Sequence, residues 1–328
     1  MPASGFTAGS PELRHPLSQR PAMRRLFIRP GAIGDCLCWL PTLAAMRPET
    51  AEVWAPGPVL PLMELAPSRR NLASTGFSLL GIPGVRLPFD LVESLRGFDE
   101  ILSWHGANRP ELREECESLR LPIRFFEPLP QRDSACHVSD WFLRQTSAWH
   151  GLDAEPAAWR GEGGRRFLLP SLDGNRPGKE PRVVIHPFSG SARKNWPIER
   201  YRRLARSIDT FTRGEVSIQW CAGPEDALPK DLTHDAWRFG DLDALARALS
   251  GTALFIGNDS GITHLATILG VPCIVFFGPE SPHMWSPRGA RVQLVGPAGD
   301  GAPASEIPYE QGETAAFSVL RDLIGKCQ

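Results

Sequence analysis

The chain has 328 residues, which is long enough for two domains of ordinary size. Hydrophobic residues make up 42% and charged residues 22%, a composition typical of a soluble globular protein. The formal net charge of -1 gives no electrostatic footprint for a nucleic acid, so no nucleic-acid partner is expected. No stretch approaches about 18 consecutive apolar residues, so we expect no transmembrane helix.

Residues 1–22 contain Arg, Pro, Ser and Gly but lack the apolar core of a secretory signal. We predict a disordered leader that ends before Met23; the alternative is a weak basic contact with an anionic membrane surface. The seven cysteines form no CxxC pair, which favours reduced, buried thiols in a cytoplasmic protein. A metal site at Cys36 and Cys38 is disfavoured because no second ligand pair follows. The glycosylation sequon at Asn258 is interpreted as a chance match.

The first half of the chain alternates short apolar strands with helical segments. The pattern predicts strands over 25–30, 51–56 and 98–104, and helices over 35–47 and 137–151. The stretch 56–90 carries several prolines and no assignable pattern. Residues around 150–181 are rich in Gly, Pro and charge, which is typical of an inter-domain connection.

The second half alternates more strictly. The pattern predicts strands over 182–186, 216–223, 253–257 and 271–277, with helices over 196–208, 242–250, 261–270 and 313–326. Pro197 is expected at the first helical position of its segment. Such alternation predicts an α/β fold with two Rossmann-like parallel-sheet domains facing a central cleft. We expect a leader (1–22), an N-terminal domain (23–165), a linker (166–181), a C-terminal domain (182–310) and a final helix (311–328).

Ligands of parallel α/β sheets bind beyond the carboxyl ends of the strands, which directs attention to three loops. The first is "RPGAIGDCL", where Gly31 and Gly34 allow a tight turn and Asp35 lies at the start of a helix. The simple alternative is that Asp35 is an N-cap that stabilises this helix by roughly 1 kcal/mol. No GxGxxG occurs anywhere in the chain, which argues against a nicotinamide or flavin dehydrogenase.

The second loop, "HPFSGSARKNWP", offers the hydroxyls of Ser189 and Ser191 beside the cations Arg193 and Lys194. Small polar groups and cations ahead of a helix suit a diphosphate, and a solvated loop with ordinary surface cations is the alternative.

The third loop, "GNDSGITHLATILG", places Asp259, Ser260 and Gly261 directly before a helix, whose N-terminal amides favour an anion. Asp259 could cap this helix or accept hydrogen bonds from sugar hydroxyls. Taken alone, His264 is more often a structural histidine than a catalytic one.

Three segments together resemble glycosyltransferase family 9, which includes the ADP-heptose:lipopolysaccharide heptosyltransferases. They are "FIRPGAIGDCLCWLPTLAAMR", "VVIHPFSGSARKNWPIERYRRLA" and "FIGNDSGITHLATILGVPCIVFFGP", in this order along the chain. The smaller "FDEILSW" and "HVSDWFLRQ" also look like the N-terminal domain of that family. The resemblance implies a GT-B fold with an N-terminal acceptor domain and a C-terminal nucleotide-sugar domain.

The resemblance also implies roles for particular residues. Asp35 matches the catalytic aspartate, a general base for attack on the anomeric carbon with inversion. The donor diphosphate is expected to contact six residues: Ser189, Ser191, Lys194, Ser260, Gly261 and Thr263. The donor sugar or ribose is expected near Asp259, Glu225 and His264. On the acceptor side we expect Gly34, Trp104 and His105, although the two aromatic residues could equally fill the core.

No cofactor and no metal is expected. "DLD" at Asp241–Asp243 imitates a manganese-binding DxD, but it opens a predicted helix, where Asp is favoured as a cap. The implied reaction moves heptose from ADP-heptose to a saccharide or lipid-linked acceptor such as lipopolysaccharide core. A lipid-linked acceptor would bring the protein to the cytoplasmic face of the inner membrane. The alternatives are a nucleotide-sugar epimerase of the same architecture and a non-catalytic nucleotide-sugar-binding protein.

Overall fold

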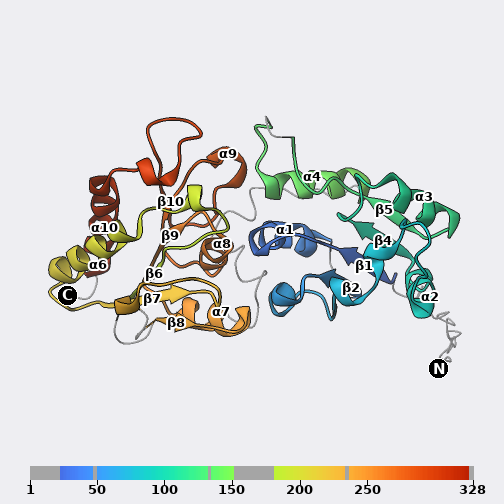
Figure 1. Ribbon diagram of the computed structural model, residues 1–328, viewed down its shortest axis with the longest axis horizontal. Helices are drawn as coiled ribbons and strands as arrows, with labels where there is room; N and C mark the ends of the chain where they lie inside the picture. The colour runs from blue at the N-terminus through green and yellow to red at the C-terminus, as the bar shows by residue number, and fades with distance from the viewer. Residues whose placement is uncertain (1–22, 47–49, 132–133, 151–180, 233–235, 325–328) are drawn as a thin grey trace, which may run out of the picture.

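The computed structural model describes residues 23–46, 50–131, 134–150, 181–232 and 236–324. The expected leader, 1–22, and almost all of the expected linker, 166–181, lie outside these ranges. Figure 1 shows two α/β domains next to each other, each built on a parallel sheet. In the described part of the chain, no helix is both long and apolar enough to cross a membrane.

The N-terminal domain has a five-stranded parallel sheet in the order β3-β2-β1-β4-β5. The strands are β1 (Arg25–Ile28), β2 (Ala51–Ala55), β3 (Ser68–Asn71), β4 (Glu100–Ser103) and β5 (Ile123–Phe125). The helices are α1 (Ile33–Ala45), α2 (Phe89–Arg96), α3 (Pro110–Ser118) and α4 (Val138–His150). The buried side chains of α1 and α4 belong to one core cluster and those of α2 and α3 to another, so helices cover both faces of the sheet.

The C-terminal domain has a six-stranded parallel sheet in the order β11-β10-β9-β6-β7-β8. The strands are β6 (Arg182–His186), β7 (Ser217–Ala222), β8 (Trp237–Arg238), β9 (Leu254–Asn258), β10 (Cys273–Phe276) and β11 (Val292–Val295). The helices are α6 (Ile198–Thr212), α7 (Leu242–Ser250), α8 (Gly261–Ile268), α9 (Pro282–Trp285) and α10 (Tyr309–Ile324). Helices α6 and α10 pack on one face, and α7 and α8 on the other.

The strands expected in both halves are present, and the helix over 242–250 has the predicted bounds. Pro197 is the N-cap of α6, one position before the predicted place. The expected C-terminal helix begins at Tyr309, and its buried side chains share a core cluster with α6, so it is part of the C-terminal domain. The unassigned stretch 56–90 contains the exposed edge strand β3 and three short 3-10 helices: Gly57–Leu62, Leu72–Ser74 and Phe77–Leu79.

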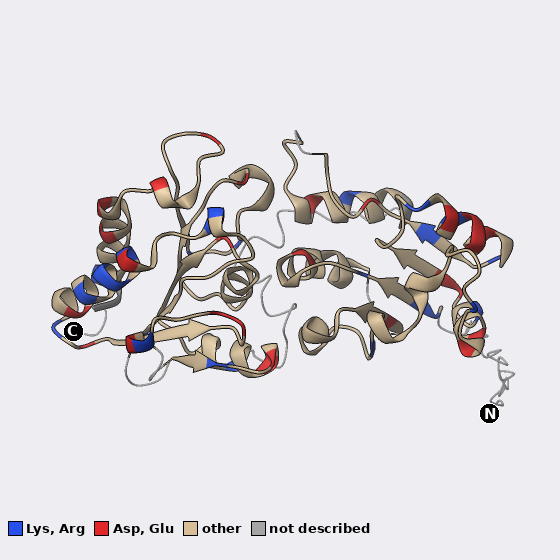
Figure 2. Ribbon diagram, in the orientation of Figure 1, with Lys and Arg blue, Asp and Glu red and all other residues tan. Residues whose placement is uncertain are grey.

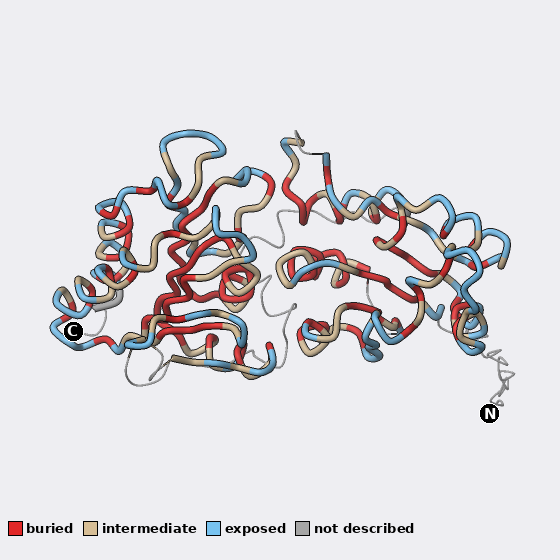
Figure 3. The backbone as a smooth tube through the Cα atoms, in the orientation of Figure 1, coloured by how far each residue is buried: buried red, intermediate tan, exposed pale blue. Residues whose placement is uncertain are grey.

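The two domains share a core where α1 meets α8, since both helices contribute buried side chains to the same cluster. Figure 3 shows the buried strands of the two sheets and the largely buried or half-buried segments of α1 and α8 between them. A cavity of about 40 Å³ lies at this junction, lined by residues of α1, α4 and α8 together with His137 and Arg288. Helices α1 and α8 are therefore in direct contact where the two domains face each other.

Charged residues of both signs are spread over both domains, as Figure 2 shows. This mixture agrees with the near-zero net charge of the sequence. The six described cysteines form no disulfide among themselves; five are buried, as expected, and Cys136 is half-buried.

Candidate functional site between the two domains

The first loop holds Asp35 in a defined position at the start of α1. The helix begins at Ile33 with Ala32 as its N-cap, so the alternative of Asp35 as N-cap is wrong. Asp35 occupies the third helical position, and its Oδ2 accepts a hydrogen bond from the Ala32 N–H at 2.9 Å. Gly31 has φ +121°, and a Cβ there would lie 2.8 Å from the Cβ of Asp35. Only glycine fits this turn without displacing the carboxylate.

Arg29 contacts the same loop, although none of the sequence motifs includes it as a candidate. Its side chain is only 2% exposed and donates a hydrogen bond to the Asp35 backbone carbonyl at 3.0 Å. Its guanidinium carbon lies 4.4 Å from the centre of the Phe142 ring. Burial lowers the pKa of Arg29, while the nearby Cys36 and Asp35 side chains oppose this shift. The sequence signal for this residue is an arginine that directly follows the apolar strand β1. Arginine side chains are rarely fully buried unless they are paired, so a buried one here indicates a specific role.

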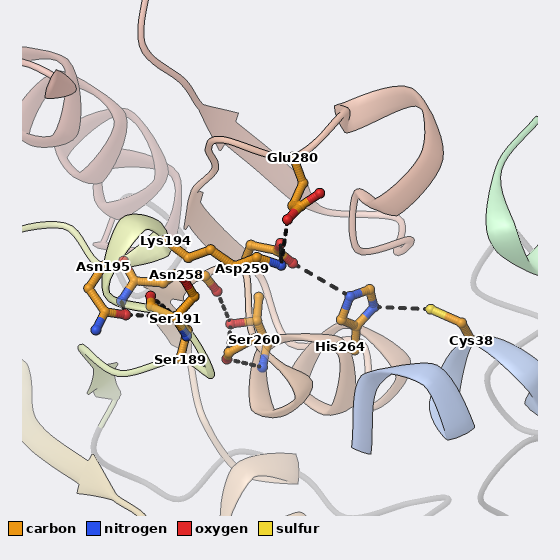
Figure 4. A network of polar contacts seen from close by, with 11 residues as sticks. Cys38, Ser189, Ser191, Lys194, Asn195, Asn258, Asp259, Ser260, His264 and Glu280 are labelled. Carbon is orange, nitrogen blue, oxygen red and sulfur yellow. Dashed lines mark hydrogen bonds and ion pairs between the residues drawn. The ribbon is translucent and has the colours of Figure 1, made fainter. Parts of the chain in front are cut away.

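The second loop brings Lys194 to the carboxyl edge of the C-terminal sheet. A 3-10 helix, Ala192–Lys194, turns the chain after β6. The Lys194 Nζ lies 2.7 Å from Asp259 Oδ2 and 3.8 Å from Glu280 Oε1. Arg193 instead donates to the carbonyl of Gly301 at 3.0 Å, so only one of the two adjacent cations joins this group. Figure 4 shows Lys194 between the two carboxylates.

Asp259 is almost completely buried, with 5% of its side chain exposed. Burial raises the pKa of Asp259, and the ammonium of Lys194 acts in the opposite direction. The close ion pair compensates for much of the cost of placing a carboxylate in a low-dielectric setting. Asp259 therefore does not cap α8, which was one of the two roles considered for it, and is held against Lys194 instead.

Ser260 is the N-cap of α8, since its Oγ accepts the Thr263 N–H at 3.3 Å. The Thr263 hydroxyl is fully buried and donates to the Asn258 carbonyl at 2.5 Å. The expectation that the Thr263 side chain contacts a diphosphate does not fit this position. Thr263 instead fixes the turn between β9 and α8, and the backbone at the start of α8 lies next to Gly34 of α1.

His264 links the Lys194–Asp259 pair to the N-terminal domain. Its Nε2 lies 3.8 Å from Asp259 Oδ1, and its Nδ1 lies 3.6 Å from the Cys38 Sγ of α1. Complete burial lowers the pKa of His264 to about 4, so the imidazole is neutral near pH 7. A chain of polar contacts thus runs from α1 through His264 and Asp259 to Lys194 (Figure 4).

Asn258 anchors this part of the site. Its Oδ1 accepts hydrogen bonds from the Trp196 N–H at 2.9 Å and the Tyr201 hydroxyl at 2.8 Å, and its Nδ2 donates to Asn195 Oδ1 at 3.3 Å. Ser189 Oγ donates to the same Asn195 oxygen at 2.7 Å, whereas Ser191 is exposed. The sequon at Asn258 is therefore a buried structural residue, which confirms the interpretation of the match as chance.

The structure places the two aromatic residues expected on the acceptor side, Trp104 and His105, in different settings. Trp104 is fully buried, and its ring packs 5.2 Å from Trp39 and 5.0 Å from Phe126. It fills the core, so its expected place in an acceptor site is wrong. His105 is half-buried, with its ring 5.8 Å from Phe77, and burial lowers its pKa.

Gly34 does lie at the junction. A Cβ on Gly261 of α8 would be 3.0 Å from the Gly34 nitrogen and 2.8 Å from the Ile33 Cβ. The starts of α1 and α8 thus touch, one from each domain.

A partly buried ion pair also joins the domains, and no motif of the sequence indicates it. Arg288 donates to both oxygens of Asp140, at 2.5 and 2.7 Å. Beside this pair, His137 Nε2 lies 2.9 Å from the Ser286 carbonyl, and Nδ1 accepts the Ser139 N–H at 3.2 Å. Burial lowers the pKa of His137 to about 4, and Arg288 acts in the same direction. These contacts hold α4 against the C-terminal domain.

The remaining expected residues lie apart from this group. Glu225 is exposed in the loop after β7, at the same edge of the sheet. Asp241 caps α7 by accepting the Ala244 N–H at 2.7 Å, and Asp243 pairs with Arg247, so "DLD" forms a helix start as predicted. Within the described ranges, no group of three or more His, Cys, Asp or Glu side chains has a metal-binding arrangement.

Comparison with known proteins extends this picture. Lipopolysaccharide heptosyltransferase 1 of Salmonella typhimurium is 30% identical over 94 residues, which cover 27% of this chain. The corresponding protein of Escherichia coli K12 is 30% identical over 95 residues. In both cases the alignment spans only 29% of the relative's length.

Solved structures match along nearly the whole chain. A glycosyltransferase of family 9 from Veillonella parvula aligns with a TM-score of 0.68 and 18% identity, covering 92% of this chain and 98% of the other. An Escherichia coli heptosyltransferase solved with ADP aligns with a TM-score of 0.64 and 16% identity, covering 90% and 100%. These similarities confirm the expected GT-B fold. The sequence profile of glycosyltransferase family 9 (heptosyltransferase) matches residues 138–308, just over half of the sequence, and the chain therefore belongs to this family.

Proposed function

We propose that this glycosyltransferase moves heptose from ADP-heptose to a saccharide acceptor such as lipopolysaccharide core, with inversion at the anomeric carbon. The observation that carries the proposal is that polar groups from both domains lie near His264 at the α1–α8 junction. Asp35 comes from the N-terminal domain, and the Lys194–Asp259 pair comes from the C-terminal domain. The contact between Gly34 and Gly261 supports placing a donor and an acceptor within reach of each other.

Asp35 is proposed as the general base. Its Oδ2 is held by the Ala32 N–H, and in the described part of the chain Oδ1 accepts no hydrogen bond. Oδ1 can then take the proton of the acceptor hydroxyl as that oxygen attacks the anomeric carbon. The new C–O bond forms on the face opposite the leaving diphosphate, whose own C–O bond breaks, so the configuration inverts.

The leaving diphosphate gains negative charge as its bond breaks. Lys194 provides a cation beside the start of α8, and the amides of Gly261 and Ile262 add the positive end of the helix. Ser191 is exposed in the neighbouring loop and can donate a hydroxyl. We propose that these groups stabilise the diphosphate without a metal ion.

The donor and acceptor identities draw on the relatives. The curated relatives are lipopolysaccharide heptosyltransferases, and one solved structure of this fold holds ADP. Glu225 is proposed to approach the ribose and Asp259 the transferred sugar. His264 is proposed to orient Asp259, since its neutral ring lies between that carboxylate and α1. With a lipid-linked acceptor, the reaction would take place at the cytoplasmic face of the inner membrane.

The experiment that tests the proposal combines binding with turnover. Thermal unfolding is measured with ADP, GDP, UDP, CDP and ADP-heptose, because a ligand at 100 times its Kd stabilises the native state by about 2.7 kcal/mol. Transfer from ADP-heptose to a heptose-free core acceptor is then followed by mass spectrometry. Stabilisation by ADP and ADP-heptose with heptose transfer is the expected result. Stabilisation by UDP or GDP alone would reject heptose as the transferred sugar.

A further inference from the structure

Glu280 lies in the loop after β10, beside the ion pair of Lys194 and Asp259. Its Oε1 is 3.8 Å from Lys194 Nζ, and its side chain is 45% exposed. In Figure 4, Glu280 approaches Lys194 from the side of the loop that leads to α9.

The ammonium of Lys194 thus faces two carboxylates of very different accessibility. Asp259 is 5% exposed, with Oδ2 2.7 Å from Lys194 and Oδ1 3.8 Å from His264. Glu280 is far more exposed, and its distance from Lys194 is longer than that of a hydrogen bond. A ligand that enters from solvent can therefore reach Glu280 without displacing the buried pair.

A second carboxylate here has opposite effects on the two parts of a nucleotide sugar. It repels a diphosphate, which is already anionic, at the cation expected to bind it. It attracts a sugar, because an ionised carboxylate accepts strong hydrogen bonds from hydroxyl groups. A free nucleoside diphosphate meets only the repulsion, whereas an intact donor meets both.

We propose that Glu280 is a specificity-determining residue that accepts a hydrogen bond from a hydroxyl of the transferred sugar and disfavours the free nucleoside diphosphate. This inference rests on the proposed function. Within the proposed function, Glu280 makes the site bind the intact donor more tightly than the diphosphate product, so that the product leaves more readily after transfer.

The test compares Glu280→Gln and Glu280→Ala with the wild-type protein by calorimetric titration with ADP and ADP-heptose. The matched control is Glu215→Gln. It removes an exposed carboxylate just before β7, at the amino ends of the strands of the same sheet. Both Glu280 variants are expected to bind ADP about threefold more tightly at low salt, and this gain should shrink as salt increases. The ratio of the ADP Kd to the ADP-heptose Kd should fall about threefold in Glu280→Gln and about tenfold in Glu280→Ala.

The outcomes separate this inference from the proposed function. If the wild-type protein binds both ligands but neither Glu280 variant changes the ratio, the role of Glu280 is wrong and the proposed function stands. If the wild-type protein binds neither ADP nor ADP-heptose, the proposed donor is wrong and this inference is lost with it. Because Glu280 is exposed, both variants are expected to fold, and their thermal unfolding without ligand checks this.

Discussion

Both domains are built on a parallel sheet with helices on both faces, but different kinds of residue lie at the carboxyl ends of their strands. In the C-terminal domain, the polar residues after β6 and β9 form one connected network around Asn258 and the Lys194–Asp259 pair. In the N-terminal domain, aromatic side chains such as Trp104 fill much of the core near the corresponding edge, and the polar groups at the junction include Asp35, Arg29 and Asp140. In the proposed function, the C-terminal domain is the donor half, which holds the charged groups, and the N-terminal domain is the acceptor half, which positions a single base.

The largest expected effect comes from removing that base. Asp35→Asn should lower the transfer rate by about a thousandfold, because the acceptor hydroxyl loses its proton acceptor. Nucleotide affinity, which depends on the other domain, should stay within about twofold of the wild type by calorimetry. Asp90→Asn, which changes an exposed residue of α2, is the control. Normal turnover in Asp35→Asn would favour a different base, and a chain that binds ADP-heptose but never transfers heptose would favour the non-catalytic alternative.

The next effect tests whether the aromatic part of the acceptor half is core. Trp104→Ala should lower the free energy of unfolding by about 3–5 kcal/mol, since it opens a cavity between Trp39 and Phe126. The measurement is urea unfolding followed by circular dichroism. In Trp104→Phe, which keeps most of the packing, the KM for the acceptor should not change. A raised acceptor KM with little loss of stability would return Trp104 to the acceptor site.

The next prediction concerns the pH dependence of the free energy of unfolding, to which His137 at the contact between the two domains contributes. The folded pKa of His137 is about 4, below its ordinary value of 6.5, so the unfolded chain binds more protons between these pH values. The free energy of unfolding should therefore fall as pH decreases from 6.5 to 4, by up to about 3 kcal/mol from this residue. His264 adds a slope of the same sign. His137→Gln should remove the His137 part, and an unchanged pH profile in urea unfolding would show that His137 is solvated rather than buried at the junction.

The smallest effect is expected in the donor half itself. Lys194→Ala should weaken ADP binding about 10–100-fold, as expected for the loss of a charge-assisted hydrogen bond. Arg193→Ala is the matched control, because the Arg193 side chain donates to Gly301 and does not join the Lys194 group. Calorimetry on both variants distinguishes the two cations. Equal losses would mean that the loop contributes only general positive charge.

The same contrast explains what could be predicted from the sequence. In the C-terminal domain, short apolar strands and amphipathic helices alternate with clear punctuation, so strand 182–186 and helix 242–250 were predicted with their observed bounds. In the N-terminal domain, β3 is an exposed edge strand of sequence SRRN, and it lacks the apolar signal on which strand prediction depends. Propensity alone could not identify it, because its partner β2 supplies the pairing.

For the site residues, the sequence predicts positions but not bonding partners. The positions of Asp35, Lys194 and Asp259 near strand ends followed from the rule for parallel sheets. Which oxygen each group binds did not follow, since Asp259 and Lys194 are 65 residues apart in the chain. The same applies to Asp140 and Arg288, which are 148 residues apart and meet only across the junction. An aromatic residue such as Trp104 could line an acceptor site or fill the core, and only its packing against Trp39 decides between these two roles.

The touching helix starts have one further consequence. Gly261 has no side chain where its neighbours across the junction are Ile33 and Gly34, and a single methyl group there would come within 3.0 Å of both. Such a methyl group would act as a wedge and prevent the two halves from closing fully. In the proposed function, the spacing between donor and acceptor depends on this contact between two backbones, and Gly261→Ala is expected to hold the two domains slightly farther apart.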